Sequence, residues 1–407
     1  MPLHAQSLQF INNCLSGHNA YDHLLELCRA PHRMAGTPQE QAALQHVSNR
    51  MSQWGYNSQV QSFAFPGWRM GDSSVSMAEG NTTLPSFPLG WSPDQEITAQ
   101  LADAGMGTAK EFSSLTISGK VVLVCEANPP GEDLHRSDKY QLAVEHGAKG
   151  FLLYHPQPGG LVPMGTISLD NRPGAIPAAG ISYESAHLLK RCLPAAVRVK
   201  TTSQALNMTS GNAIARHQQA TEDYVLVGAH IDTWNCPGAY DNGSGVAMVM
   251  ELARLLRDME AARHIRFAAF GGEELGLFGS YHLAGQTPLP RVVFNLDVSA
   301  IKDGKQQVFL QQPGPFSDWI TKLLQSLHLP LSLETRLVKH SDHWPFCQHG
   351  RPAFWLLSGN QKYNFAHTIY DTPDKLTPQA FTLPLLATGV CLIETAMHAS
   401  IGAGKAQ

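Results

Sequence analysis

The C-terminal half of the chain alternates short apolar runs with longer segments whose apolar residues recur every three to four positions. Runs such as YVLVGA and IRFAAF are apolar at successive positions, which is typical of central strands covered on both faces. Segments such as SGVAMVMELARLLRDM and FTLPLLATGVCLIETAMHAS have helical spacing. Because strand and helix alternate, we expect an α/β fold with a mixed, mainly parallel sheet and helices on both sides.

The rest of the chain has a different pattern. QEQAALQHVSNRMSQWG predicts a helix from Gln39 to Gly55, and NSQVQSFAF predicts a short strand after it. Residues 85–205 are rich in Pro and Gly and contain short strand-like runs such as GKVVLVCE. KYQLAVEHGAKGFLLYHP predicts a helix that ends at Gly147, followed by a strand over Gly150–Tyr154. These residues therefore predict a compact α+β insert.

Composition excludes several classes of protein. The chain has 407 residues, of which 43% are hydrophobic and 15% charged, so there is ample material for a large core. Lys and Arg number 29 against 33 Asp and Glu, a net charge of −4. No basic surplus is available for a nucleic-acid backbone, so we expect no nucleic-acid partner.

The sequence also lacks the patterns of a membrane span and of a leader peptide. No window of 18 consecutive apolar residues occurs, so we expect no membrane span. The start, MPLHAQSLQFINNCLSG, has neither a basic nor an apolar leader region. The seven cysteines are widely spaced and odd in number, which argues against a disulfide framework. We predict a cytoplasmic location, or a secreted one if this start is a processed one. The oligomeric state is left open.

Side chains that suit a metal follow each predicted strand. His230, Asp232 and then Asp241 follow YVLVGA, and Glu273 and Glu274 follow IRFAAFGG. Asp297 ends the run VVFNL, and His367 comes after FWLLSG and a loop. In open α/β sheets ligands bind beyond the carboxyl ends of the strands. We therefore expect these side chains to meet at one edge of the sheet.

The residue types point to zinc, which takes imidazole nitrogen and carboxylate oxygen. An odd number of carboxylates allows one to bridge two ions, roughly 3.5–4 Å apart in such sites. Asp241, in the tight turn YDNGSG, is the candidate bridge. Asp232 can orient the imidazole of His230. Of the adjacent Glu273 and Glu274, one can bind metal while the other accepts a proton from water.

The motifs HID, DNGSG, GGEELGLFGS, NLD and HTIYDTPDKL, in this order over residues 210–400, resemble the M28 family of zinc aminopeptidases and carboxypeptidases. HRMAGT, near the N-terminus, is similar to the segment that precedes the sheet in that family. GKVVLV, AVEHGAKGFLLY and IPAAGIS resemble a protease-associated (PA) domain. The resemblance implies a phosphorylase/hydrolase-like α/β/α sandwich. Residues 1–84 and 206–407 would form the peptidase domain and 85–205 the PA insert.

The resemblance also implies a role for each matching residue. His230 and Asp297 would bind one Zn²⁺, Glu274 and His367 would bind a second, and Asp241 would bridge them. Glu273 would be the general base and Asp232 would orient His230. The segment Ser341-Asp342-His343 resembles one near the family's substrate pocket. The candidate substrate-binding residues are His340, Asp342 and His343.

One departure concerns the oxyanion. Some members of the family carry a tyrosine just before the SDH segment, where this chain has Val338, Lys339 and His340. The oxyanion donor is thus open, with His340 a candidate.

The function that this resemblance implies is a two-zinc exopeptidase that acts on peptides, expected to be an aminopeptidase. A carboxypeptidase or dipeptidase on the same site remains an alternative, because residues that could hold either peptide terminus are available. A glutaminyl-cyclase-like enzyme uses one metal, and the full ligand set argues against it. A non-catalytic binding protein on a decayed peptidase scaffold would have lost ligands or the base, and this chain has all of them.

Overall fold

The computed structural model describes residues 2–79, 82–168, 170–360 and 365–398, and its strands form one mixed sheet through two lobes. In the large lobe four central strands run parallel in the order β14-β11-β9-β10. They are β9 (Val225–His230), β10 (Ile265–Phe270), β11 (Val292–Leu296) and β14 (Ala353–Gly359). At the edge, β12 (Lys305–Leu310) is antiparallel to β14 and parallel to β13 (Leu331–Thr335). The expected mixed, mainly parallel sheet is confirmed.

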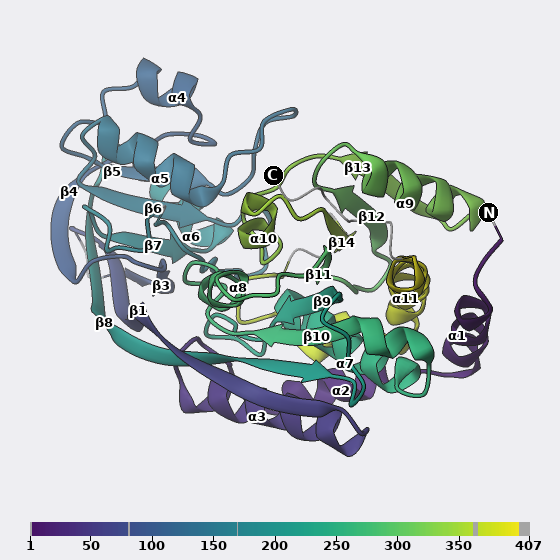
Figure 1. Ribbon diagram of the computed structural model, residues 1–407. Coiled ribbons are helices and arrows are strands. Elements are labelled where there is room, and N and C mark those ends of the chain that lie inside the picture. Colours follow the sequence, from purple (N-terminus) through teal and green to yellow (C-terminus); the bar gives the residue numbers. More distant parts are fainter. Residues whose placement is uncertain (1, 80–81, 169, 361–364, 399–407) are drawn as a thin grey trace.

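Helices cover both faces of this sheet (Figure 1). Side chains alternate along each strand, so Val225, Val227 and Ala229 of β9 join the larger core. Leu226, between them, packs in a smaller core on the opposite face. The larger core also receives α1 (Ala5–Ser16), α2 (Ala20–Leu27), α3 (Pro38–Gln53), α7 (Ser244–Leu256), α9 (Pro315–Ser326) and α11 (Thr382–Met397). The smaller core receives α8 (Phe278–Ala284) and α10 (Trp344–Gln348).

The helix predicted over Gln39–Gly55 is confirmed as α3. The Thr37 hydroxyl accepts a hydrogen bond from the backbone N–H of Glu40, and Pro38 occupies the first turn, where its missing N–H costs nothing. Gly55 follows with a φ of +91°, a left-handed conformation that stops the helix. Shorter helical turns are η1 (Ala239–Gly243), η2 (Glu260–His264), η3 (Pro373–Lys375) and η4 (Pro378–Phe381).

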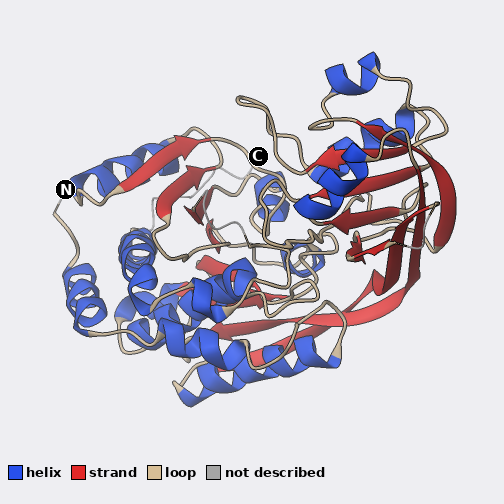
Figure 2. Cartoon of the chain, turned by 180° about the vertical axis from the view of Figure 1, so that it is seen from behind, coloured by secondary structure: helices blue, strands red, loops and turns tan. Residues whose placement is uncertain are grey.

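Two unusually long strands, β1 (Asn57–Met77) and β8 (Ala196–Arg216), join the two lobes. They pair antiparallel along nearly their whole length, from Asn57 opposite Arg216 to Met77 opposite Val197, with one irregularity. One end of β8 pairs with β10 in the large lobe and its other end with β4 in the insert lobe. Figures 1 and 2 show this ribbon sweeping from one lobe to the other. The predicted boundary at 205/206 falls inside β8, and the domain limits stay a prediction.

The insert lobe has its own α+β architecture. Its strands β4, β5, β6 and β7 are parallel, and β3 closes the edge antiparallel to β7. The bounds are β2 (Thr83–Leu84), β3 (Ser86–Pro88), β4 (Gln95–Asp103), β5 (Val121–Cys125), β6 (Gly150–Tyr154), β7 (Ala178–Ile181), α4 (Ala109–Ser114), α5 (Arg136–Glu145) and α6 (Tyr183–Arg191). The strand predicted over Gly150–Tyr154 is confirmed as β6.

The segment Pro378–Met397, which contains α11, is long and apolar enough for a membrane span by length and composition alone, with a mean hydropathy of 1.6. In this fold, however, 72% of its apolar window is buried. Its residues pack on α1, α7 and α9, which is how a central helix of a folded core behaves.

Candidate metal centre

The carboxyl ends of the parallel strands bring the predicted ligands together. His230 is the last residue of β9, and Glu273 and Glu274 lie just beyond β10. Asp297 follows β11 directly, and His367 comes from the loop after β14. Asp241 lies in η1, which opens α7, the helix that packs against β9 and β10. Since β9 and β10 are paired with Phe270 opposite His230, their ends lie level at one edge of the sheet.

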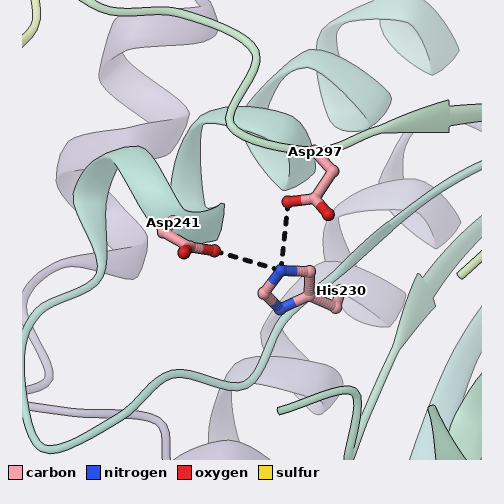
Figure 3. Close-up of side chains that lie close together, drawn as sticks. All are labelled: His230, Asp241 and Asp297. Atoms are coloured by element: carbon pink, nitrogen blue, oxygen red, sulfur yellow. Dashed lines mark hydrogen bonds and ion pairs between the residues drawn. The ribbon is translucent and has the colours of Figure 1, made fainter. Parts of the chain in front are cut away.

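Asp241 stands between two histidines. One of its carboxylate oxygens lies 3.2 Å from Nε2 of His230, and the other lies 3.0 Å from Nε2 of His367. The His230 nitrogen is also 3.3 Å from Asp297 Oδ1, as Figure 3 shows. The His367 nitrogen is also 3.2 Å from Glu274 Oε2. The five side chains thus form two adjoining groups that share one carboxylate.

Glu273 belongs to the same cluster but to neither of these two groups. Its carboxylate lies within 4.8 Å of ligand atoms of His230 and Glu274. Burial raises the pKa of Glu273 well above its usual value, and the neighbouring carboxylates reinforce this shift against the opposing effect of His230.

The buried carboxylates of the cluster need positive charge close to them. Burial lowers the pKa of His230, but the carboxylates of Glu273 and Asp297 outweigh burial and hold that pKa well above its usual range. For His367, burial again lowers the pKa, but the nearby carboxylates, Glu274 above all, outweigh burial and raise the pKa to about 10. Buried carboxylates repel one another unless a positive charge lies between them. Here the histidines can supply that charge only by remaining protonated.

The residues present fit zinc. Its protein ligands are imidazole nitrogens and carboxylate oxygens, and both kinds converge here. In addition, Glu274 Oε1 is buried and has no hydrogen-bond partner among the described residues. A buried carboxylate oxygen without a donor is costly. A metal ion at this point would satisfy it.

Asp232 supports the cluster in a way that the sequence reasoning did not foresee. Its two carboxylate oxygens accept hydrogen bonds from the backbone N–H groups of Glu273 and Glu274, at 3.0 and 3.1 Å. Nδ1 of His230 lies 3.1 Å from the backbone carbonyl of Asp232 and 3.8 Å from its carboxylate. In this structure the carbonyl, rather than the carboxylate, is within hydrogen-bond distance of the imidazole.

Three further residues, none of them among the predicted metal-binding or catalytic residues, hold the ligands. The carboxylate of Asp371 accepts hydrogen bonds from the backbone N–H groups of Tyr240 and Asp241, at 2.7 and 2.9 Å. Trp234 Nε1 donates to Glu274 Oε2 at 2.6 Å. The Ser341 hydroxyl donates to Asp297 Oδ2. Their sequence signals were their positions: Asp371 lies within HTIYDTPDKL, Ser341 begins the SDH segment, and Trp234 follows His230 by four residues.

The cluster forms the floor of a cavity of about 430 Å³ at the junction of the two lobes. The insert lobe contributes part of the wall, through His135, Arg136, Ser137, Thr166, Ser168 and Asn171. The large lobe contributes Gly276, Leu277, Tyr281, Val298, Lys339, His340 and Trp344, in addition to the cluster itself. A ligand bound in the cavity would therefore touch both lobes.

The three candidate substrate-binding residues are placed differently. His340 lines the cavity, whereas Asp342 and His343 are buried and are not part of the lining. The ring nitrogens of His343 face Asn295 and the backbone carbonyl of Val338, at 3.2 and 2.9 Å. Burial lowers the pKa of His343 to about 4, so this ring is a neutral part of the core.

Comparison with known proteins agrees with this arrangement. Residues 212–383 match Peptidase family M28, and residues 97–189 match the PA domain. Aminopeptidase YwaD of Bacillus subtilis is 30% identical over 372 residues, which cover 88% of this chain and 79% of that protein. The probable lipoprotein aminopeptidase LpqL of Mycobacterium tuberculosis is 29% identical over 283 residues, covering 66% of this chain and 52% of LpqL.

Solved structures share the whole architecture. BSAP, a zinc aminopeptidase from Bacillus subtilis, has a TM-score of 0.72 at 25% identity, with 92% of this chain and 94% of that chain covered. A peptidase M28 precursor from Shewanella amazonensis has a TM-score of 0.78 at 23% identity, with 96% of both chains covered, and shows the same fold. The resemblances to the M28 family and to the PA domain are thus confirmed. The chain belongs to peptidase family M28 and is a metallopeptidase that carries a PA domain.

Proposed function

We propose that the protein is an aminopeptidase that uses two zinc ions. The observation that carries the proposal is the position of Asp241, whose two oxygens face His230 and His367. His230 and Asp297 would hold one ion and Glu274 and His367 the other, with Asp241 shared. Relatives named as aminopeptidases, one of them a zinc aminopeptidase, support the choice of metal and of the peptide's amino end.

The metal ions, when bound, polarise a carbonyl and supply hydroxide at neutral pH. The chain's own contribution centres on Glu273. Its carboxylate takes a proton from the attacking water and passes it to the nitrogen of the leaving amine. Asp232 positions this carboxylate by holding the backbone N–H groups of Glu273 and Glu274.

Glu273→Gln tests the assignment, because it removes the proton acceptor and keeps the shape. We expect kcat to fall by about 10²- to 10⁴-fold while the zinc content, measured by mass spectrometry, stays at two per chain. Glu222→Gln, on the exposed surface, is the matched control. A Glu273→Gln variant with near-normal turnover would overturn the role of this residue, and a zinc content of one would overturn the two-ion site.

The choice of peptide end is tested with peptides that are free, N-acetylated or C-amidated. We expect stepwise loss of residues from the amino end that acetylation blocks and amidation does not. Trimming from the carboxyl end would replace the aminopeptidase by a carboxypeptidase and leave the metal centre standing.

A further inference from the structure

The two ion positions differ in the lobe that supports their ligands. The first position is that of His230 and Asp297. Nδ1 of His230 faces the backbone carbonyl of Asp232, and the carboxylate of Asp297 accepts a hydrogen bond from the Ser341 hydroxyl. All four residues belong to the large lobe, so these supporting contacts are made within that lobe.

The second position is that of Glu274 and His367, and the insert lobe reaches the neighbours of Glu274. Trp91, which lies between β3 and β4, donates its indole N–H to the backbone carbonyl of Leu275 at 3.1 Å. Leu275 directly follows Glu274 in the chain. The Trp91 side chain is buried, and a buried carbonyl that loses its donor is costly. This hydrogen bond therefore fixes the backbone next to the ligand.

The insert also packs against the side chain that holds the Glu274 carboxylate. Trp234 donates its indole N–H to Glu274 Oε2 at 2.6 Å. The ring of Trp234 lies against Gly90 of the insert, where an added Cβ would be 2.2 Å from Cη2 of the indole. Trp234 and Leu275 belong to the same buried cluster as Trp91, although they come from the other lobe. Close packing of this kind fixes the direction of the Trp234 N–H.

The other ligand of the second position is held from the insert as well. His367 has a φ of +57°, a left-handed conformation that is uncommon for a residue other than glycine. Its backbone carbonyl accepts a hydrogen bond from the N–H of Met164, in the insert, at 2.8 Å. Nη2 of Arg136, also in the insert, lies 2.7 Å from Nδ1 of the imidazole. The insert thus contacts both the backbone and the ring of this ligand.

We propose that the insert lobe positions the ligands of the second ion and that Trp91 is a positioning residue for it. Zinc affinity at the second position then depends on the contact between the lobes, whereas affinity at the first position does not. Trp91 touches neither ligand and acts through the backbone of Leu275. Partners that orient metal ligands change metal affinity by about 10- to 100-fold. The proposal rests on the proposed two-zinc centre.

Trp91→Phe tests the proposal, because it keeps an aromatic ring and removes the indole N–H. Chelator competition on the zinc-loaded full chain measures the affinity of each ion. We expect Trp91→Phe to weaken one ion by about 10-fold and to leave the other within about twofold of its wild-type affinity. A variant that weakened neither ion, or both ions equally, would overturn the proposal.

Tyr140→Phe is the matched control. The Tyr140 hydroxyl is buried and donates to the backbone carbonyl of Ile176 at 2.9 Å, so the variant also removes a hydrogen bond to a carbonyl, but one within the insert. We expect both zinc affinities to stay at their wild-type values. The Tm of the metal-free proteins reports the loss of stability separately. Equal effects of Trp91→Phe and Tyr140→Phe on zinc affinity would also overturn the proposal.

Variants that retain one position identify the ion that is weakened. His367→Ala removes a ligand of the second position, and His230→Ala removes a ligand of the first. Added Trp91→Phe should lower zinc affinity by about 10-fold in His230→Ala and leave it unchanged in His367→Ala. The opposite pattern would overturn the proposal.

Gly90→Ala perturbs the same contact by a second route, because the added Cβ displaces Trp234. It should also weaken only the second ion. Gly150→Ala is its control within the insert, since the added Cβ would lie 3.1 Å from the end of the Ile97 side chain, on the β4 strand of the insert. A wild-type protein that bound a single zinc ion would overturn the proposed two-zinc function. Two bound ions that were both insensitive to Trp91→Phe and Gly90→Ala would overturn the role of the insert alone.

Discussion

Glu251, on α7, allows a direct test of how strongly one buried ion cluster stabilises this fold. Its carboxylate is fully buried and accepts hydrogen bonds from Arg254 Nε and Nη2, at 2.9 and 2.7 Å. The backbone N–H of Asn19 donates to it at 3.0 Å, and His23 Nε2 lies 3.2 Å away. The cluster thereby joins α7 to the start of α2. Glu251→Gln keeps the size of the side chain and removes its charge.

The magnitude follows from the pKa of this group. Burial alone would raise the pKa of Glu251, but the hydrogen bonds from Arg254, His23 and Asn19 outweigh it and lower the pKa from 4.5 to about 2. At 1.36 kcal/mol per pKa unit, this corresponds to about 3 kcal/mol. Because the folded-state pKa is the lower one, the stabilisation is complete above pH 4.5 and is lost as the pH falls towards 2.

The assay is urea unfolding followed by tryptophan fluorescence, with chelator present so that the pH dependence of metal binding does not enter. We expect Glu251→Gln to lower the free energy of unfolding by about 3 kcal/mol at pH 7 and by roughly 2 kcal/mol at pH 3.5. Glu222→Gln is the matched control, because Glu222 pairs with Arg266 but is 72% exposed, and should cost less than about 1 kcal/mol. A loss below about 1 kcal/mol at pH 7, or one independent of pH, would refute the reasoning.

Three further predictions concern the site and the insert lobe. Asp371→Ala removes the acceptor for two backbone N–H groups in the turn that contains Asp241. Zinc affinity, measured by chelator competition, should therefore fall about 10- to 100-fold. An unchanged affinity would show that Asp371 does not support the metal centre. Exposed Asp374→Ala should leave that affinity unchanged. Gly180→Ala would place Cβ 1.8 Å from the carbonyl oxygen of Pro163, so thermal unfolding should show a loss of about 1–3 kcal/mol, whereas Gly359→Ala, with 3.7 Å of space, should show little. Removal of metal with a chelator should abolish peptidase activity and lower the Tm. Added zinc should restore both, whereas magnesium, which prefers oxygen ligands, should not. Activity that survives chelation would contradict the assignment as a metallopeptidase.

The architecture and the meeting of the ligands were predictable because both depend on local pattern. Apolar runs followed directly by His230 or Asp297 place those side chains at strand ends, and parallel strands end at the same edge. The edge strands β12 and β13 escaped prediction. Their sequences, KQQVFL and LSLET, are half polar, so neither is a continuous apolar run like those of the central strands.

Contacts between the lobes were not predictable from the chain. Arg136 and His367 are 231 positions apart, and nothing in the RSDKYQL segment indicates that its first residue reaches the centre. The detailed role of Asp232 was not predictable from the sequence either. Its spacing of two residues from His230 was compatible with either a carboxylate or a carbonyl contact to the imidazole, and only the fold shows that the carboxylate is occupied by Glu273 and Glu274.

The ribbon of β1 and β8 decides how the insert could be removed or exchanged. The insert is not attached by two flexible linkers, because both strands that leave the large lobe continue unbroken into it. A deletion of the insert therefore has to cut the two strands at a pair of residues that lie opposite each other, such as Phe65 and Met208. The cut ends then have to be joined by a hairpin turn that keeps the pairing of the two strands. A transplant from a relative has the same requirement, since a shift of one residue would turn every side chain of the grafted strand to the opposite face. The insert can thus be exchanged only as the distal part of the continuous ribbon that β1 and β8 form.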